Sequence, residues 1–267
     1  MKYEKLLITS GGVPYVTTSD FAKCKELVAG FATRHGGVSK APYDTMNFGF
    51  NRGDNADDVR QNYKIFASAT GADVKKLAAV RQVHSTKVLM ASAESLTNPF
   101  TGDKVQEADG VVSNTKGIFP VCYFADCIPI LLYEPKAMCW GAVHSGWRGA
   151  AADIVGAAIN RMKSELGANP EKIIMAMGPS ICPSCFEVGP EVAEQFGSEF
   201  ILAGYEKPHI NLWQVIERSA VNAGVLAANI TCTGECTMEC IDGYFSHRAH
   251  GENRGVLMAV IGVPQTV

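Results

Sequence analysis

Apolar and polar positions alternate along much of the chain in short runs that are typical of β-strands. Three of these runs adjoin or contain a reactive side chain: Val121–Asp126 before Cys127, Met138–Val143 before His144, and Leu77–Met90 around His84. The last run is rich in β-branched residues, so we expect a continuous strand there with His84 in its middle. The pattern thus predicts a cysteine and two histidines on or at the ends of three strands.

Segments with the apolar periodicity of α-helices separate the strand-like runs. Asn55 can cap a helix over Asp57–Thr70 that ends at Gly71. The clearest helix is Gly149–Leu166, which has one apolar stripe and is followed by Gly167. We also expect a hairpin at Gly11-Gly12, helices over Ser19–Leu27, Pro190–Gln195 and Leu212–Ala223, strands over Asp109–Ser113, Lys172–Met177 and Val256–Val263, and loops at 91–108, Ser180–Gly189 and Tyr244–Arg254.

These elements follow one another without a regular strand–helix–strand rhythm, which favours an α+β fold with mixed β-sheets flanked by helices. The sequence has no internal repeat, no low-complexity tract and no linker with a shift in composition. We therefore expect residues 1–267 to form a single domain.

Composition and charge narrow the class of protein. The net charge of -3 provides no basic surface for nucleic acid, so no nucleic-acid partner is expected. The most apolar run, Val121–Tyr133, is interrupted by Asp126 and is too short to cross a bilayer. No secretory signal is evident at the start of the chain, so we expect a cytoplasmic protein without a membrane partner. Its nine cysteines should then be buried thiols, metal ligands or nucleophiles rather than disulfides.

Several common catalytic signatures are absent from the sequence. It contains no G-x-x-x-x-G-K-[ST], G-x-G-x-x-G, G-x-S-x-G or H-E-x-x-H motif. The commonest nucleotide hydrolases, dehydrogenases, serine esterases and zinc proteases are therefore not indicated.

The residues His84, Cys127 and His144 leave three interpretations open. Two imidazoles and a thiolate suit zinc, and three protein ligands would leave a fourth position for water or substrate. Their long spacing would require a site assembled by the fold rather than a local zinc knuckle. Alternatively, Cys127 could be a nucleophile with His144 as its base, or the three side chains could simply pack in the core.

A series of motifs resembles, in order, the YfiH-like family, also called the multicopper polyphenol oxidoreductase (laccase) or purine nucleoside phosphorylase family. The resemblance runs from about residue 31 to the C-terminus. The motifs are Thr33-Arg-His-Gly-Gly-Val-Ser39, Gln82-Val-His84-Ser, Ala108-Asp-Gly110, Ala125-Asp-Cys-Ile-Pro129, Val143-His-Ser-Gly-Trp-Arg-Gly149, Gly178-Pro-Ser-Ile181, Phe186-Glu-Val-Gly189 and Phe245-Ser-His-Arg248.

The resemblance implies a fold related to a cysteine-hydrolase toxin domain and a zinc site formed by His84, Cys127 and His144. It implies a phosphorylase that takes phosphate and purine nucleosides such as adenosine, inosine, guanosine and methylthioadenosine, with possible adenosine deaminase activity. We expect a monomer or small homo-oligomer. The alternatives are a metal-free Cys–His hydrolase or amidase acting on peptidoglycan precursors, and a copper-dependent polyphenol oxidase.

The oxidase alternative can be tested against the histidines. A four-copper oxidase needs many histidines, whereas this chain has six and no His-x-His pair. Copper could still replace zinc in a single site, because copper has the higher intrinsic affinity for such ligands.

Seven residues are candidates for contacts with substrate or phosphate: Arg34, Asn47, Gln82, Asp109, Asp126, Arg148 and Arg248. Arg148 follows glycines at an expected helix start, where backbone N–H groups could hold an anion; it could equally be a solvated residue of the first turn. Asp126 could orient a ligand or only make hydrogen bonds at a strand end. Arg248 lies in His247-Arg-Ala-His250, where the family more often has Tyr-Arg-Arg-Asp.

The remaining cysteines form a second pattern. Cys232, Cys236 and Cys240 are spaced four residues apart, and Cys182 and Cys185 form a C-x-x-C pair. This spacing matches no strong metal motif. The five thiols could hold a second metal, although buried or surface thiols are the simpler interpretation.

Overall fold

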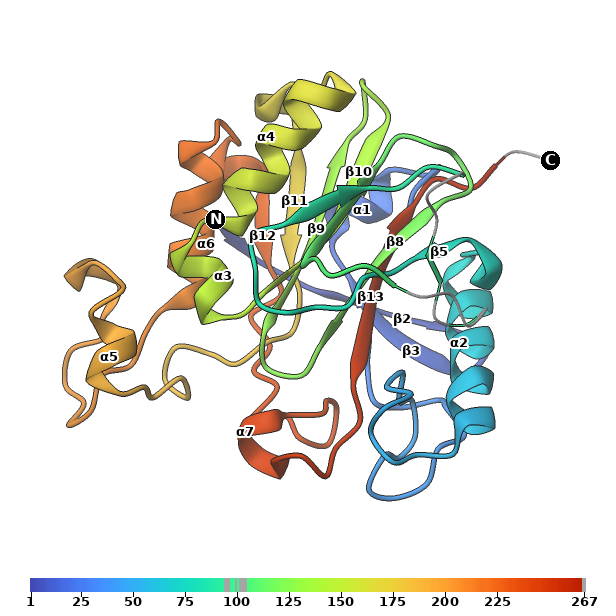
Figure 1. Ribbon diagram of the computed structural model, residues 1–267, viewed down its shortest axis with the longest axis horizontal. Coiled ribbons are helices and arrows are strands. Elements are labelled where there is room, and N and C mark those ends of the chain that lie inside the picture. The colour runs from blue at the N-terminus through green and yellow to red at the C-terminus, as the bar shows by residue number, and fades with distance from the viewer. Residues whose placement is uncertain (94–96, 99, 101–104, 266–267) are drawn as a thin grey trace.

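The protein has two mixed β-sheets packed face to face, with helices on both outer faces (Figure 1). The computed structural model describes residues 1–93, 97–98, 100 and 105–265. The predicted α+β class with mixed sheets flanked by helices is confirmed.

Within these residues, one sheet has seven strands in the order β1-β12-β11-β9-β10-β7-β6, and the other has six in the order β2-β3-β4-β13-β8-β5. Both sheets contain parallel and antiparallel pairs. The first sheet contains β1 (Lys2–Tyr3), β12 (Ile230–Cys232), β11 (Ile174–Met177), β9 (Ile128–Glu134), β10 (Cys139–Ser145), β7 (Gly110–Ser113) and β6 (Val88–Met90). The second contains β2 (Leu6–Ser10), β3 (Val13–Thr17), β4 (Val28–Ala32), β13 (Leu257–Gly262), β8 (Phe119–Phe124) and β5 (Leu77–Ala78).

The helices cover the outer faces of the two sheets. In Figure 1, α4 and α6 lie on the side of the seven-stranded sheet, and α2 lies on the side of the six-stranded sheet. The α-helices are α1 (Ser19–Lys23), α2 (Ala56–Thr70), α3 (Trp147–Ala151), α4 (Ile154–Leu166), α5 (Pro190–Ala193), α6 (Leu212–Asn222) and α7 (His247–His250). Short 3-10 helices are η1 (Val74–Lys76), η2 (Pro170–Lys172), η3 (Ser198–Phe200) and η4 (Ala227–Asn229).

Strand periodicity explains how each sheet buries both of its faces. In β13, Leu257 and Ala259 face the other sheet, whereas Met258 and Val260 pack against the α2 side. Because successive side chains point to opposite faces, a strand between two layers must be apolar throughout. The continuous apolar runs in the sequence reflect this double burial.

Helix α2 confirms the capping signals in the sequence. The Asn55 side chain accepts hydrogen bonds from the backbone N–H groups of Asp57 and Asp58, and Gly71 ends the helix at φ +86°. The hairpin at Gly11-Gly12 is also present, between β2 and β3.

The helix predicted over Gly149–Leu166 is wrong as one element, because α3 and α4 are separate. Between them, Asp153 has φ +61°, and its side chain accepts a hydrogen bond from the N–H of Gly156. The apolar stripe that predicted the helix lies within α4, after Asp153. It therefore contains no sign of the break before α4.

Three other predictions differ from the structure by more than one or two residues at an end. The helix expected to reach Leu27 ends at Lys23, and the loop expected over Tyr244–Arg254 contains α7. The strand expected over Leu77–Met90 is limited to β5 and β6 at its two ends. The loop expected at 91–108 lies partly outside the described residues. None of the described helices has the length and apolar character needed to cross a membrane.

Candidate metal centre and cavity

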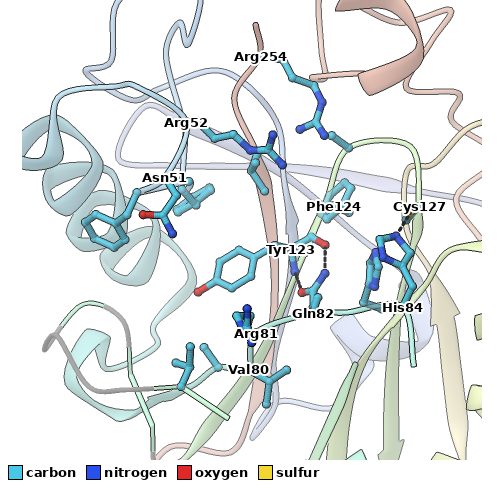
Figure 2. A pocket seen from close by; sticks show the side chains of 18 of the residues that line it. Asn51, Arg52, Val80, Arg81, Gln82, His84, Tyr123, Phe124, Cys127 and Arg254 are labelled. Carbon is cyan, nitrogen blue, oxygen red and sulfur yellow. Dashed lines mark hydrogen bonds between the residues drawn. The ribbon is translucent and has the colours of Figure 1, made fainter. Parts of the chain in front are cut away.

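Three segments bring His84, Cys127 and His144 together where the two sheets meet. His84 lies between β5 and β6, Cys127 lies in the turn from β8 to β9, and His144 lies near the end of β10. One ligand atom of each lies within 4.8 Å of the others. The Cys127 sulfur is 3.9 Å from Nε2 of His84, the contact dashed in Figure 2. The three residues are called the triad below.

The buried carboxylate of Asp109 explains why His84 is not in a strand. It accepts hydrogen bonds from three successive N–H groups, those of Val83 at 3.2 Å, His84 at 2.9 Å and Ser85 at 2.6 Å. His84 takes φ +59°, a left-handed conformation that is rare for residues other than glycine. The Asp109 carboxylate therefore bends the chain at His84. The β-branched residues around His84 had predicted a strand at this position.

The same carboxylate orients His144. An Oδ1 atom of Asp109 lies 3.0 Å from Nδ1 of His144, and both side chains are buried. With Nδ1 bonded to the carboxylate, Nε2 is the nitrogen left for a metal or a proton. Asp109 thus fixes both histidines of the triad, one through its backbone and one through its ring.

Charges within the triad shift the pKa values of its members. Burial opposes ionisation of Cys127, but the charge and hydrogen bonding of His144 and His84 lower the pKa of its thiol to about 6. Burial likewise opposes protonation of His144, yet Cys127 and Asp109 raise its pKa to about 9. For Asp109, hydrogen bonds from His144 and Ser85 outweigh burial and lower its pKa to about 2. Without a metal, the site favours a thiolate, an imidazolium and a carboxylate.

Asp126 shapes the turn that presents Cys127. It has φ +89° and is buried, and its carboxylate accepts hydrogen bonds from Oγ1 of Thr237 and from the N–H of Arg248, both at 2.6 Å. Its carbonyl oxygen accepts another from the N–H of Ile181 at 2.9 Å. A left-handed residue other than glycine costs about 1–3 kcal/mol, so these three bonds hold the turn in a conformation it would not adopt alone.

Gly146 lets the side chains of His84 and Cys127 pack closely against the backbone. A Cβ atom at this position would lie 2.8 Å from Cδ2 of His84 and 3.0 Å from the sulfur of Cys127. The space beside the two side chains therefore exists only because residue 146 has no side chain.

The donor set fits a borderline-soft divalent cation. Two imidazole nitrogens and a thiolate are characteristic zinc ligands, and three protein ligands leave one position open. The carboxylate behind His144 is the outer partner that metal-bound histidines usually have. His84, Cys127 and His144 could thus hold zinc, and copper would accept the same donors.

The triad lies in the wall of a cavity of about 420 Å³, within the usual size range of small-molecule sites. Aromatic side chains dominate this cavity on the side of α2. Phe50 stacks on Tyr63 with ring centroids 5.5 Å apart, and the Tyr63 hydroxyl donates to that of Tyr123 at 2.7 Å. The aromatic residues that line it are Phe48, Phe50, Tyr63, Tyr123 and Phe124.

Three arginines line the same cavity, and none of them was among the candidates from the sequence. Arg254 is buried, and its guanidinium has one hydrogen bond, to the carbonyl of Gly255, among the described residues; its Nε has no partner. Arg52 pairs with Glu252 and Arg81 with Glu107. In Figure 2, Arg52 and Arg254 lie at one end of the cavity and Arg81 at the other. No local sequence signal distinguishes Arg254, which becomes buried only through packing of the loop before β13.

The arginines that the sequence suggested as candidates are not among the described residues that line the cavity. Arg34 packs over Phe245 and donates to the carbonyls of Asp44 and Ile241. Arg248 donates to the carbonyls of Cys185 and Glu187, and Arg148 is exposed with its guanidinium over Trp147. Binding roles for these arginines stay predictions, as does the anion site at residues 145–152, where α3 has only five residues.

The side chains of the polar candidates Asn47 and Gln82 form hydrogen bonds with the protein backbone. Gln82 lines the cavity, and its amide exchanges two hydrogen bonds with the backbone of Tyr123, at 2.6 and 2.8 Å. Asn47 is fully buried and accepts from the N–H groups of Gly49 and Val256. Both side chains therefore hold segments of the cavity wall in place.

The fold and site together define a two-sheet α+β protein with a candidate His₂Cys metal centre beside an aromatic cavity. Residues 28–264 match the family described as multi-copper polyphenol oxidoreductase laccase, and the chain belongs to this family, as its motifs predicted.

Named relatives align over most of the chain. A purine nucleoside phosphorylase of Deinococcus radiodurans is 32% identical over 97% of this chain and 96% of its own. An adenosine deaminase, RL5, from an unknown prokaryotic organism is 34% identical over 88% and 94%. The crystal structure of YlmD from Geobacillus stearothermophilus superposes with a TM-score of 0.89, at 26% identity over 98% of this chain and all of that one.

Proposed function

We propose that the protein is a zinc-dependent purine nucleoside phosphorylase of the cytoplasm, with adenosine deamination as a possible second activity. The observation that carries this proposal is the triad in the wall of a cavity that also presents stacked aromatic rings and a buried arginine. Relatives named purine nucleoside phosphorylase and adenosine deaminase support an enzyme of this kind. The proposed substrates are phosphate and nucleosides such as adenosine, inosine, guanosine and methylthioadenosine.

His84, Cys127 and His144 would hold the zinc ion, which when bound supplies a Lewis acid that polarises an oxygen of the substrate. Asp109 keeps Nδ1 of His144 occupied and sets the loop of His84, so it acts as a positioning residue. Asp126 and Gln82 act in the same way on the turn of Cys127 and on β8. These contacts would hold the three ligands in place before a metal binds.

The cavity offers separate surfaces for the two substrates. Aromatic faces such as those of Phe50 and Tyr123 suit a purine ring. Arg254 and its neighbour Arg52 suit the phosphate dianion, because the Arg254 guanidinium has no carboxylate partner among the described residues. In the reaction, the bond between C1′ and the purine nitrogen breaks, a bond from C1′ to a phosphate oxygen forms, and the departing base takes up a proton.

The test follows adenosine and inosine with and without phosphate, together with the metal content of the purified protein. We expect release of base and ribose 1-phosphate only when phosphate is present, and its loss in His84→Ala and Cys127→Ala. Cys24→Ser, at the end of α1 and away from the cavity, is the matched control and should retain full activity. Base release that is independent of phosphate, or turnover that survives complete removal of metal, would overturn the proposal.

A second candidate function rests on the geometry of Cys127, His144 and Asp109. A thiol close to an imidazole whose far nitrogen bonds a buried carboxylate is the arrangement of a Cys–His hydrolase. Such an enzyme, for example an amidase acting on peptidoglycan precursors, would work without metal. Metal-free protein that hydrolyses an amide and is inactivated by thiol alkylation would favour this candidate over the phosphorylase.

Copper-dependent oxidation of polyphenols has less support from the side chains. Among the described residues, each group of three or more potential ligands contains at most two histidines. A four-copper centre needs many more, so the triad could hold one copper ion at most.

A further inference from the structure

A second group of potential ligands lies in two loops that the proposed reaction does not use. One sulfur or oxygen atom each of Cys182, Cys185, Cys236 and Glu239 lies within 4.8 Å of the others. The first two residues belong to the loop after β11, and the last two to the loop after β12. These four residues are called the thiol cluster below, and none of them lines the cavity.

Each loop contributes two side chains that are three residues apart on a backbone turn. In the first turn, the carbonyl of Cys182 accepts hydrogen bonds from the N–H groups of Cys185 at 3.1 Å and Phe186 at 3.0 Å. In the second, the carbonyl of Cys236 accepts from the N–H of Cys240 at 2.9 Å. Because backbone bonds maintain both turns, the four side chains are directed to one point without any bond between sulfurs.

The two turns are also fixed to each other. Ser180 and Cys236 form a parallel β-bridge, in which Thr237 donates to the carbonyl of Ser180 at 3.1 Å. The N–H of Cys182 points at the sulfur of Cys236, 3.3 Å away. An N–H donor of this kind stabilises a thiolate, the form in which cysteine binds metals.

The dimensions are close to those of a tetrahedral zinc site. With zinc–sulfur distances of about 2.3 Å, neighbouring ligands lie about 3.8 Å apart. Atoms that all lie within 4.8 Å of one another need only a small contraction to reach this geometry, and Cys185 is already 3.5 Å from an oxygen of Glu239. Cys182 and Cys236 are buried, Cys185 is half-buried and Glu239 is exposed, so a carboxylate would close the side that faces solvent.

We propose that Cys182, Cys185, Cys236 and Glu239 bind a second zinc ion in a closed, structural site. On binding, the three thiols release their protons to solvent, and four protein ligands leave no position for substrate. The ion would join the two loops beside the triad, because Ile181 and Thr237 both donate to Asp126 in the turn of Cys127. Its role is to hold the turn that presents a ligand of the first metal.

The structure separates these ligands from the other cysteines nearby. Cys232 is buried in β12, and Cys240 is exposed after the second turn; neither belongs to the group. Of the five thiols that the sequence offered for a second metal, the fold selects three and adds a carboxylate. Cys240→Ser is therefore a matched control for substitutions in the cluster.

The test measures zinc per chain in the intact protein and in variants that remove one site at a time. We expect two zinc ions in the wild type, one in the double variant His84→Ala/Cys127→Ala, one in Cys185→Ser, and two in Cys240→Ser. In the double variant, cobalt should give the strong sulfur-to-metal absorption and tetrahedral d–d bands of a site with three thiolates. That variant has no triad, so its metal content reports on the cluster whether or not the proposed phosphorylase function is right.

Two results would overturn the proposal. One is a double variant that holds no zinc or cobalt after purification and reconstitution under reducing conditions. The other is a purified, non-reduced protein whose mass is lower by two hydrogens because two cluster cysteines form a disulfide. If Cys185→Ser does not fold, Glu239→Gln at the exposed position serves instead. In the double-variant background, this substitution should weaken zinc binding in a chelator competition by about tenfold or more, because even a partner outside the ligand shell is worth about 10–100-fold; unchanged affinity would also overturn the closed four-ligand site.

Discussion

The triad and the thiol cluster are connected through hydrogen bonds to Asp126, but their ligands differ in kind. The triad combines two imidazoles with one thiolate and faces a cavity of about 420 Å³. The cluster combines three cysteine sulfurs with one carboxylate and lies outside the lining of that cavity. Three ligands with an open position are typical of a catalytic metal, whereas four protein ligands are typical of a structural one.

The hydrogen bonds that position the ligands also differ between the two groups. Behind the triad, buried Asp109 accepts hydrogen bonds from Val83, His84, Ser85 and His144, so both histidines are positioned through one carboxylate. Around the cluster, backbone turns do the positioning. The two groups therefore differ in their access to the cavity and in the hydrogen bonds that support them, as well as in their ligands.

The largest effect is expected for Gly146→Ala, which fills the space beside the triad. Its Cβ would lie 2.8 Å from His84 and 3.0 Å from Cys127, so the ligands must move apart. We expect phosphorolysis to fall about 100-fold or more, since a displacement of about 1 Å at a reacting centre has effects of this size. Metal analysis should show one zinc lost and the cluster zinc retained.

Gly243→Ala is the control for this variant, because its Cβ would have no heavy atom closer than 3.6 Å and its φ is not positive. Wild-type activity of Gly146→Ala would show that the triad does not need this space. It would contradict the distinction between a triad with an open position and a closed thiol cluster.

Asp109→Asn should weaken the triad metal and leave the cluster metal unchanged. The amide cannot accept all the hydrogen bonds that the carboxylate accepts, and it removes the negative charge behind His144. Loss of such an outer partner typically costs 10–100-fold in metal affinity. Competition with a chromogenic chelator measures both sites in one titration. Equal weakening of both metals would show that Asp109 acts on the whole fold rather than on the triad.

Arg254→Met should raise the KM for phosphate about tenfold, the effect of losing about 1.4 kcal/mol of binding energy. The KM for inosine should change little, because the aromatic wall remains intact. Arg218→Met, at an exposed site on α6, is the matched control. Steady-state kinetics at varied phosphate distinguish the two substrates, and an unchanged phosphate KM would place the anion elsewhere in the site.

The smallest effect on activity is expected where the two regions are joined. Thr237→Val removes the hydroxyl that donates to buried Asp126 at 2.6 Å, and an unsatisfied buried acceptor costs about 1–3 kcal/mol. The free energy of unfolding in urea should fall by this amount, with a modest loss of activity. Thr233→Val is a close control, since the buried Thr233 hydroxyl has no hydrogen-bond partner among the described residues. Equal losses in the two variants would argue against a specific link through Asp126.

The sequence alone predicted the features that depend on neighbouring residues, such as helix caps and apolar strands. Asn55 and Gly71 set the limits of α2 because capping depends on neighbouring residues. The apolar runs before Cys127 and His144 are strands, because a strand buried on both faces must be apolar throughout. These runs placed Cys127 and His144 next to strand ends, whereas the strand expected around His84 was wrong and His84 was singled out by its family motif.

Only the tertiary structure decided what surrounds those residues. His84 lies in a bend because Asp109, 25 residues away in the chain, captures its backbone N–H, and no local propensity encodes that contact. Arg254 enters the cavity, and Glu239 joins three cysteines, through packing of distant loops. Side-chain type and periodicity are local properties of the chain, whereas a metal site or a cavity depends on hydrogen bonds and packing between segments far apart in sequence. The sequence thus determined which groups could react, and the fold determined which of them meet.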